Sequence, residues 1–259
     1  MVGKDIGTIW GRKGIRALLM VMPVILLLVI PVVYFAAISL LPSLPGSQIP
    51  ASLQTVLAKD GSGYSQFWAD AFTTLLCPVL FLMVPIICSV ASASCVFVGE
   101  KENGTLETLF LSSVNPKSLF SAKITACSLI SVIISLISFV IFSITTSIVD
   151  LLLSAPYFLN LEWLITVFLL MPALSLFSVT FVSLVLSRVY SVGESLQTMG
   201  YLILPFLILY LIQFTGVFRI TPLLLIVLAV ALAALSIILY NISSRKFNAE
   251  YLREHRTEE

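Results

Sequence analysis

The sequence predicts an all-α integral membrane protein with six transmembrane helices and both termini in the cytoplasm. Three features lead to this prediction: an apolar composition, six long apolar runs, and basic residues that lie almost entirely on one side of those runs. Apolar residues make up 59% of the 259 residues and charged residues only 10%, with a mean hydropathy of +1.10. Such a composition is typical of bundled transmembrane helices rather than of a soluble domain.

Each apolar run is long enough to cross the hydrocarbon core, which is about 30 Å thick and takes roughly 20 residues of helix. No Asp, Glu, Lys, Arg or His occurs within any of them. Charges at membrane depth are costly, and ion-driven pumps normally keep a carboxylate or a basic residue there. We therefore expect a membrane domain without buried charge and without ion coupling. The six runs cover residues 17–41, 71–98, 124–149, 163–186, 196–215 and 222–242.

The first run is preceded by a basic segment, residues 1–16. The run spans 25 residues, more than the roughly 7 to 15 of a signal-peptide core, so we expect it to be retained as a span. Ile6, Ile9 and Trp10 recur at helical spacing, which predicts a short interfacial helix with its tryptophan among the headgroups. A simple positive flank that only sets the orientation is an equally good interpretation.

Lys and Arg residues set the orientation of the spans. If the spans alternate, only Lys59 and Arg219 lie on one side and the other twelve of the 14 basic residues lie on the opposite side. The positive-inside rule then places both termini, the loop 99–123 and the tail 244–259 in the cytoplasm. The only sizeable external segment covers residues 42–70, and about thirty residues cannot build an independent core. Receptor and adhesion functions are therefore disfavoured.

Cysteine and histidine usage argues against an enzyme. Cys77, Cys88, Cys95 and Cys127 lie in or beside apolar runs, where free cysteine behaves as a small hydrophobic residue, so neither a disulfide framework nor a metal site is expected. His255, the only histidine, lies in a charged tail, and no phosphate-binding G-x-x-x-x-G-K-[ST] loop occurs. No cofactor site is expected in this chain. If the protein uses ATP, another subunit must bind ATP and Mg²⁺.

The loop 99–123 holds the one dense cluster of charges among the spans. Glu100 and Glu102 leave the membrane, Gly104 allows a break, and Thr105 is placed to cap a short helix. In that helix Leu106, Leu109 and Phe110 share one face at spacings i, i+3 and i+4, whereas Glu107 stays polar. A short amphipathic helix on such a loop either lies on lipid or docks into a protein groove, and its acidic character disfavours anionic lipid.

The loop carries a pattern formed by Glu100, Glu102, Gly104, Thr105, Leu106 and Glu107, then Ser113, Val114, Pro116 and Lys117, then Ala122 and Lys123. This pattern resembles the cytoplasmic signature of the ABC-2 type permeases, the membrane subunits of ATP-binding-cassette exporters. The outline of the whole chain is also similar to that family, with six spans, cytoplasmic termini and the signature between the second and third spans. The loop 186–197 resembles the family's second cytoplasmic loop, with less specific residues.

The resemblance implies that the loop forms a coupling helix seated on a cytoplasmic ATPase subunit, and that two permease chains face each other across the substrate path. It implies no nucleic-acid partner. The coupling residues would be Glu100, Glu102, Gly104, Thr105, Leu106 and Glu107, with Leu109 and Phe110 on the apolar face. Some members carry large external domains that this chain lacks, so functions that depend on such domains are not expected.

Substrate contacts are harder to identify from the sequence. In the family the second and fifth spans lie near the dimer axis, which here makes Cys88, Ser92, Tyr201 and Tyr210 candidates for the substrate path. The third span carries a stripe of hydroxyls for which close helix packing and a weakly polar substrate lining are both possible interpretations. Prolines in the spans are compatible with flexing helices, although they are common in membranes. The stripe consists of Ser128, Ser131, Ser135 and Ser138.

The sequence thus favours a single permease domain, residues 1–259, in a prokaryotic cytoplasmic membrane. Its function would be ATP-driven export of a hydrophobic or amphipathic compound, such as a drug, a lipid, a lipid-linked sugar or a peptide, with ATP hydrolysed by a partner subunit. The alternative is a non-transporting interaction or sensor protein whose cytoplasmic loop recruits a soluble partner.

Overall fold

The computed structural model describes residues 2–40, 64–102, 116–153, 159–185, 191–214 and 220–257, and these residues are helical almost throughout, with no strand among them. Six helices are long and apolar enough to cross a membrane, as predicted. Their bounds are Lys13–Ile38, Phe67–Val98, Lys117–Ile148, Leu161–Val185, Val192–Leu209 and Pro222–Arg245. The predicted apolar runs fall within a few residues of these bounds, because hydrocarbon thickness fixes the length of an apolar helix.

The spans are divided into shorter elements by π-helical turns. The first span contains α2 (Lys13–Val24), η1 (Ile25–Val29) and α3 (Ile30–Leu40), and it follows the separate helix α1 (Val2–Gly11). The second contains α5 (Tyr64–Ala71), η3 (Phe72–Leu76), α6 (Cys77–Ala93) and η4 (Ser94–Val98), and continues into α7 (Gly99–Glu102). The others are α9 (Pro116–Leu153), α10 (Leu161–Ile165) with η5 (Thr166–Leu170) and α11 (Met171–Val185), α12 (Val192–Phe214) and α13 (Pro222–Thr257).

In the part of the chain that the structure describes, three of the four π-helical turns are followed by a proline. Pro31, Pro78 and Pro172 each follow such a turn within two residues. Proline has no N–H and clashes with the carbonyl one turn earlier, and the wider turn accommodates this. The fourth π-helical turn, η4, is followed by Gly99 and Glu100, so no proline explains it.

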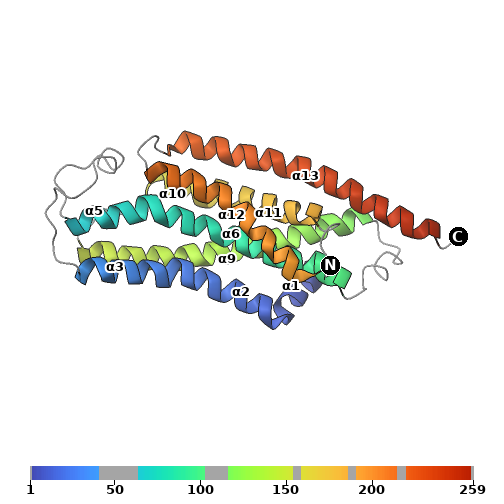
Figure 1. Ribbon diagram of the computed structural model, residues 1–259, viewed down its shortest axis with the longest axis horizontal. Coiled ribbons are helices and arrows are strands. Elements are labelled where there is room, and N and C mark those ends of the chain that lie inside the picture. Colours follow the sequence, from blue (N-terminus) through green and yellow to red (C-terminus); the bar gives the residue numbers. More distant parts are fainter. Residues whose placement is uncertain are drawn as a thin grey trace.

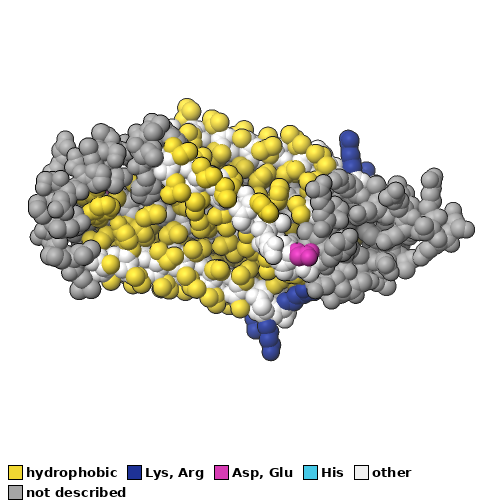
Figure 2. All heavy atoms as spheres, in the orientation of Figure 1, with side chains coloured by type: hydrophobic (Ala, Val, Ile, Leu, Met, Phe, Trp, Pro, Cys, Tyr) yellow, Lys and Arg dark blue, Asp and Glu magenta, His cyan; other side chains and the backbone are white. Residues whose placement is uncertain are grey.

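The helices lie side by side in one elongated bundle, and α1 and the end of α13 lie at the same end of it (Figure 1). This end is referred to as the N/C end. Which side of a membrane this end faces stays a prediction. On the face shown in Figure 2, a broad apolar band covers the middle of the bundle, and the charged side chains that are described there lie beside it toward the N/C end.

The second span lies at the centre of the bundle. About three quarters of it is buried (72%), against 22% for each of the spans built on α12 and α13. Its helix α6 contacts α2, α9, α11 and α12. Small buried residues such as Ser89, Ala91, Ser92 and Ala93 allow these neighbours to approach closely.

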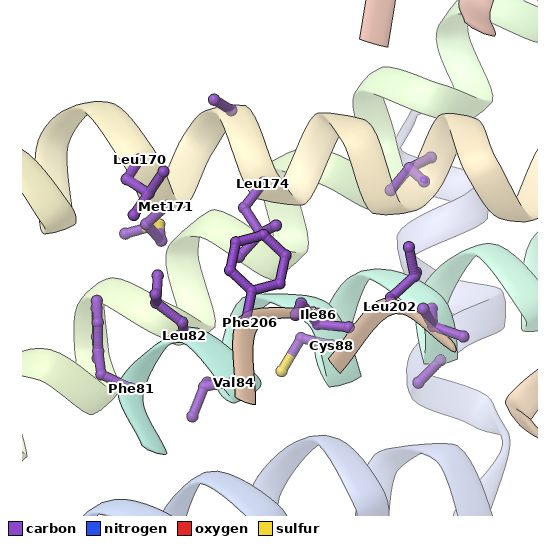
Figure 3. Packing of buried hydrophobic residues seen from close by; sticks show 14 of the residues in the cluster. Phe81, Leu82, Val84, Ile86, Cys88, Leu170, Met171, Leu174, Leu202 and Phe206 are labelled. Carbon is purple, nitrogen blue, oxygen red and sulfur yellow. The ribbon is translucent and has the colours of Figure 1, made fainter. Parts of the chain in front are cut away.

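Larger side chains fill the remaining space in the core. Side chains of α6, α11 and α12 converge there, and the labelled ones include Ile86, Leu174, Leu202 and Phe206 (Figure 3). All four are buried. A displacement of α6 must therefore move neighbouring helices, because packed interiors have few voids to absorb it.

Candidate functional site at the N/C end of the second span

The predicted coupling loop begins where the second span ends. Glu100 and Glu102 lie in α7, the four-residue helix that continues η4, and the side chain of Glu102 is not described. The remaining predicted coupling residues, Gly104, Thr105, Leu106, Glu107, Leu109 and Phe110, lie outside the described residues. The structure therefore shows the base of the loop, residues 94–100, which we call the α6 exit.

An ion pair joins the α6 exit to α9. Lys123 of α9 pairs with the carboxylate of Glu100. The Lys123 side chain is 3% exposed, whereas that of Glu100 is 24% exposed and reaches the surface. The ammonium also lies 5.8 Å from the centre of the Phe97 ring, within the distance of a cation–π interaction.

The expectation of a membrane domain without buried charge was wrong at its edges. Lys123 is buried one residue before the predicted run 124–149, and Asp70 is buried one residue before the run 71–98. The runs themselves contain no charged residue, but the folded helices continue beyond the runs, and residues just outside the runs are buried as well. A buried lysine is tolerated when it is paired, and Lys123 is.

Arg12 also lies against the α6 exit, at Gly99. It occupies the break between α1 and α2, where the backbone is extended at φ −79° and ψ 107°. Its Nη2 atom is 2.8 Å from the position that a Cβ on Gly99 would occupy. Any side chain at residue 99 would have to displace the guanidinium, so the glycine permits this close approach.

The break at Arg12 folds α1 back onto the bundle. Ile9 of α1 is completely buried, and α1 contacts both α9 and η4. The exposed Trp10 agrees with the predicted short helix at the membrane surface. Thus α1 is part of the packing around the α6 exit and does more than flank the first span.

A fourth element reaches the α6 exit through a hydroxyl pair. The Oγ atoms of Ser94 in η4 and Ser195 in α12 are 2.7 Å apart and share a hydrogen bond, and both residues are buried. Ser191 caps the start of α12 by accepting a hydrogen bond from the backbone N–H of Glu194 at 3.2 Å. The α1–α2 break, α9 and α12 therefore all contact the segment from which the loop emerges.

The four predicted path residues do not share one surface. Cys88 and Ser92 of α6 are completely buried inside the chain. Tyr201 of α12 is 75% exposed on the outside of the bundle, and the side chain of Tyr210 is not described. Ser92 has a buried Oγ without a hydrogen-bond partner.

In the serine stripe on the third span, only the hydroxyl of Ser131 bonds to another helix, whereas that of Ser128 bonds to Thr125 in its own helix. Ser131 donates to the carbonyl oxygen of Pro85 and accepts from Ser89, while Ser175 of α11 donates to the carbonyl oxygen of Ser128 at 3.4 Å. Ser138 donates to Ile134 within its own helix. These contacts favour the packing interpretation for the stripe. Ser135 differs, since its buried Oγ has no partner.

Lys123 was part of the loop pattern, but the sequence analysis did not predict its ion pair with Glu100. The sequence nevertheless carried a signal for this pair. The second run ends at residue 98 and the third begins at residue 124, so Glu100 and Lys123 lie at similar depth on adjacent helices. The contact between Arg12 and Gly99 had no such signal, because it depends on the angle of the break after α1. Among the described residues, no group of three His, Cys, Asp or Glu side chains could hold a metal ion.

Comparison of the chain with protein-family models, with curated proteins and with solved structures finds no match. The resemblance to the ABC-2 type permeases stays a prediction that rests on the loop residues and on the outline of six spans.

Proposed function

We propose that the chain is the membrane subunit of an ATP-driven exporter, with its N/C end in the cytoplasm of a prokaryotic cell and the loop 103–115 seated on a separate ATP-binding-cassette ATPase. The observation that carries this proposal is the position of the α6 exit. The charged loop continues the most buried span, which contacts four neighbouring helices. A push on the loop would reach the core of the bundle directly.

The energy source follows from the distribution of charges. Among the described residues, the buried charged side chains are Asp70 and Lys123, which lie near the first residues of the spans Phe67–Val98 and Lys117–Ile148 and not at their middles. Proton and sodium carriers normally hold ionisable groups at membrane depth. Work delivered by a partner that hydrolyses ATP is therefore the favoured source, with ATP and Mg²⁺ bound by that partner.

The cargo would pass between two copies of the chain and not through one. Cys88 and Ser92 are completely buried within the chain. An apolar boundary between two copies, with hydroxyl tips such as that of the exposed Tyr201, suits a hydrophobic or amphipathic compound better than a small ion.

The experiment is purification of the tagged full-length chain from its own membranes, followed by an ATPase assay and identification of the bound subunits. Leu109→Asp and Glu107→Lys should lower the co-purified ATPase activity about tenfold or more, because each damages one face of the proposed docking helix. Arg245→Gln is the matched control, since it removes an exposed charge on α13 but leaves the loop intact.

Unchanged ATPase binding in both loop variants would contradict the proposal. Recovery of a soluble protein without ATPase activity, lost in the loop variants but not in Arg245→Gln, would replace the exporter with the non-transporting interaction protein.

A further inference from the structure

We infer that Lys123 is a positioning residue for the coupling loop: through Glu100, and together with Arg12 at Gly99, it holds the direction in which the chain leaves the α6 exit. The coupling part of this inference rests on the proposed function, whereas the holding role of Lys123 is a property of this chain alone.

The ion pair is placed where it can orient the chain. Glu100 lies two residues after η4 and three before the start of the loop 103–115, so its side chain is the last described attachment before that loop. Lys123 lies on α9, the helix to which the same loop returns at Pro116. The pair therefore ties the two ends of the loop to each other.

Stability alone is a poor reason for this pair. Burying an ammonium costs several kcal/mol, and apolar replacements of buried ion pairs are often neutral or stabilising. Such a pair does give each side chain a defined partner and a defined geometry. The partner of Lys123 is the Glu100 carboxylate, and the Phe97 ring lies beside the ammonium.

The segment before the ion pair is the π-helical turn η4, and its hydrogen-bond spacing sets the rotation of α7. A residue that fixes this rotation is therefore useful. In η4 the N–H of Gly99 bonds to the carbonyl of Ser94, five residues earlier, and no proline enforces this spacing. A return to the usual spacing of four residues would turn α7 by about 100° relative to α6. Such a turn would carry Glu100 away from Lys123 and Gly99 away from Arg12.

The contact at Gly99 is a second restraint on the same segment. The guanidinium of Arg12 fills the space that a Cβ would take. Lys123 of α9 and Arg12 of the α1–α2 break therefore restrain two successive residues, Glu100 and Gly99. Together they favour one rotational setting of α7.

Hydrogen–deuterium exchange of the amides in residues 99–103 tests the holding role in the purified full-length chain, without any ATPase. Lys123→Met should speed this exchange about tenfold, because the charged hydrogen bond that fixes α7 is lost. Lys123→Arg and the exchanged pair Glu100→Lys with Lys123→Glu should return the rate toward that of the wild type. Arg245→Gln, which removes an exposed charge on α13, should leave it unchanged.

The coupling role is tested with the co-purified ATPase and a fluorescent phospholipid analogue as the transported probe. Lys123→Met should lower the amount of probe moved per ATP hydrolysed while the thermal unfolding midpoint stays near that of the wild type. Lys123→Arg should restore the ratio. A purely structural role would instead lower the midpoint and the amount of folded protein.

The outcomes separate the two claims. If the amides of residues 99–103 exchange at the same rate in Lys123→Met and in the wild type, the inference is overturned, whatever the ATPase assay shows. Faster exchange in Lys123→Met, together with a wild-type chain that binds no ATPase, supports the holding role and contradicts the proposed function. Faster exchange with an unchanged transport ratio overturns the coupling role.

Discussion

The Oγ atom of Ser131 in α9 donates a hydrogen bond to the carbonyl oxygen of Pro85 in α6 over 2.9 Å. The same hydroxyl accepts a hydrogen bond from Ser89 at 2.8 Å, so two helices are joined by a small polar network in the interior. Hydrogen bonds between transmembrane helices contribute about 0.6 kcal/mol on average, and their close packing adds to this.

Ser131→Leu should therefore destabilise the protein. Leucine removes both hydrogen bonds and adds volume to a completely buried position, which together should cost about 1 to 3 kcal/mol of unfolding free energy. Thr125→Leu is the control, because Thr125 is exposed and its hydroxyl bonds only to carbonyls of its own helix. The thermal unfolding midpoint in detergent is the measurement, and equal midpoints for the two variants would count against the packing interpretation.

The sequence predicted the spans well because hydrophobicity and length are local properties. It could not tell which apolar side chains face lipid and which face protein, since both surfaces are apolar in a membrane. Cys88 and Tyr201 illustrate the difference: the family resemblance made both of them candidates for the substrate path, yet Cys88 is completely buried and Tyr201 is 75% exposed.

The central position of the second span could be anticipated in part. Its small residues Ser89, Ala91, Ser92 and Ala93 are typical of close helix contacts, and the structure buries all four. The contact of Arg12 with Gly99 depends on tertiary structure, because a break of one residue directs α1 back onto α9.

Variants of the candidate path residues should differ in their effect on folding, according to how buried each residue is. Ser92, a candidate for the substrate path, is completely buried. We expect Ser92→Leu to lower the amount of folded protein, because overpacking a filled core is destabilising. Tyr201→Ala should leave folding unchanged, because its side chain is 75% exposed.

The measurement for Ser92 and Tyr201 is folded protein by size-exclusion chromatography, followed by export rate per folded molecule. An altered rate in Tyr201→Ala would place α12 beside the substrate path. Normal folding of Ser92→Leu would show that α6 has room around Ser92.

Transport of a fluorescent phospholipid analogue in proteoliposomes should need ATP and should persist when ionophores collapse the proton and sodium gradients. Asp70 is the buried carboxylate on which an ion-coupled mechanism would most naturally depend. Asp70→Asn should therefore retain ATP-driven transport, measured as the initial rate per folded molecule. Loss of transport when ionophores are added with ATP present would show that transport is coupled to an ion gradient. Loss of transport in folded Asp70→Asn would show that the buried carboxylate is needed for it.

Gly99→Ala should displace the Arg12 guanidinium at little cost in folding. The new Cβ would lie 2.8 Å from Nη2 of Arg12, so one of them must move, and the end of a long flexible side chain moves more easily than a helix. The free energy of unfolding, followed through the thermal midpoint, should change by no more than about 0.5 kcal/mol, which is the effect of an ordinary surface substitution. Exchange of the amides in residues 99–103 should nevertheless become faster, because one of the two restraints on α7 is lost.

Gly193→Ala provides the matched control, since Gly193 lies near the start of α12 and its Cβ would meet only the Ser191 Oγ at 3.9 Å. It should change neither the midpoint nor the exchange. If Gly99→Ala behaved like this control, the approach of Arg12 would have no part in holding the α6 exit. If it instead strongly lowered the midpoint, the glycine would serve packing of the core, since only a displaced backbone could cost that much.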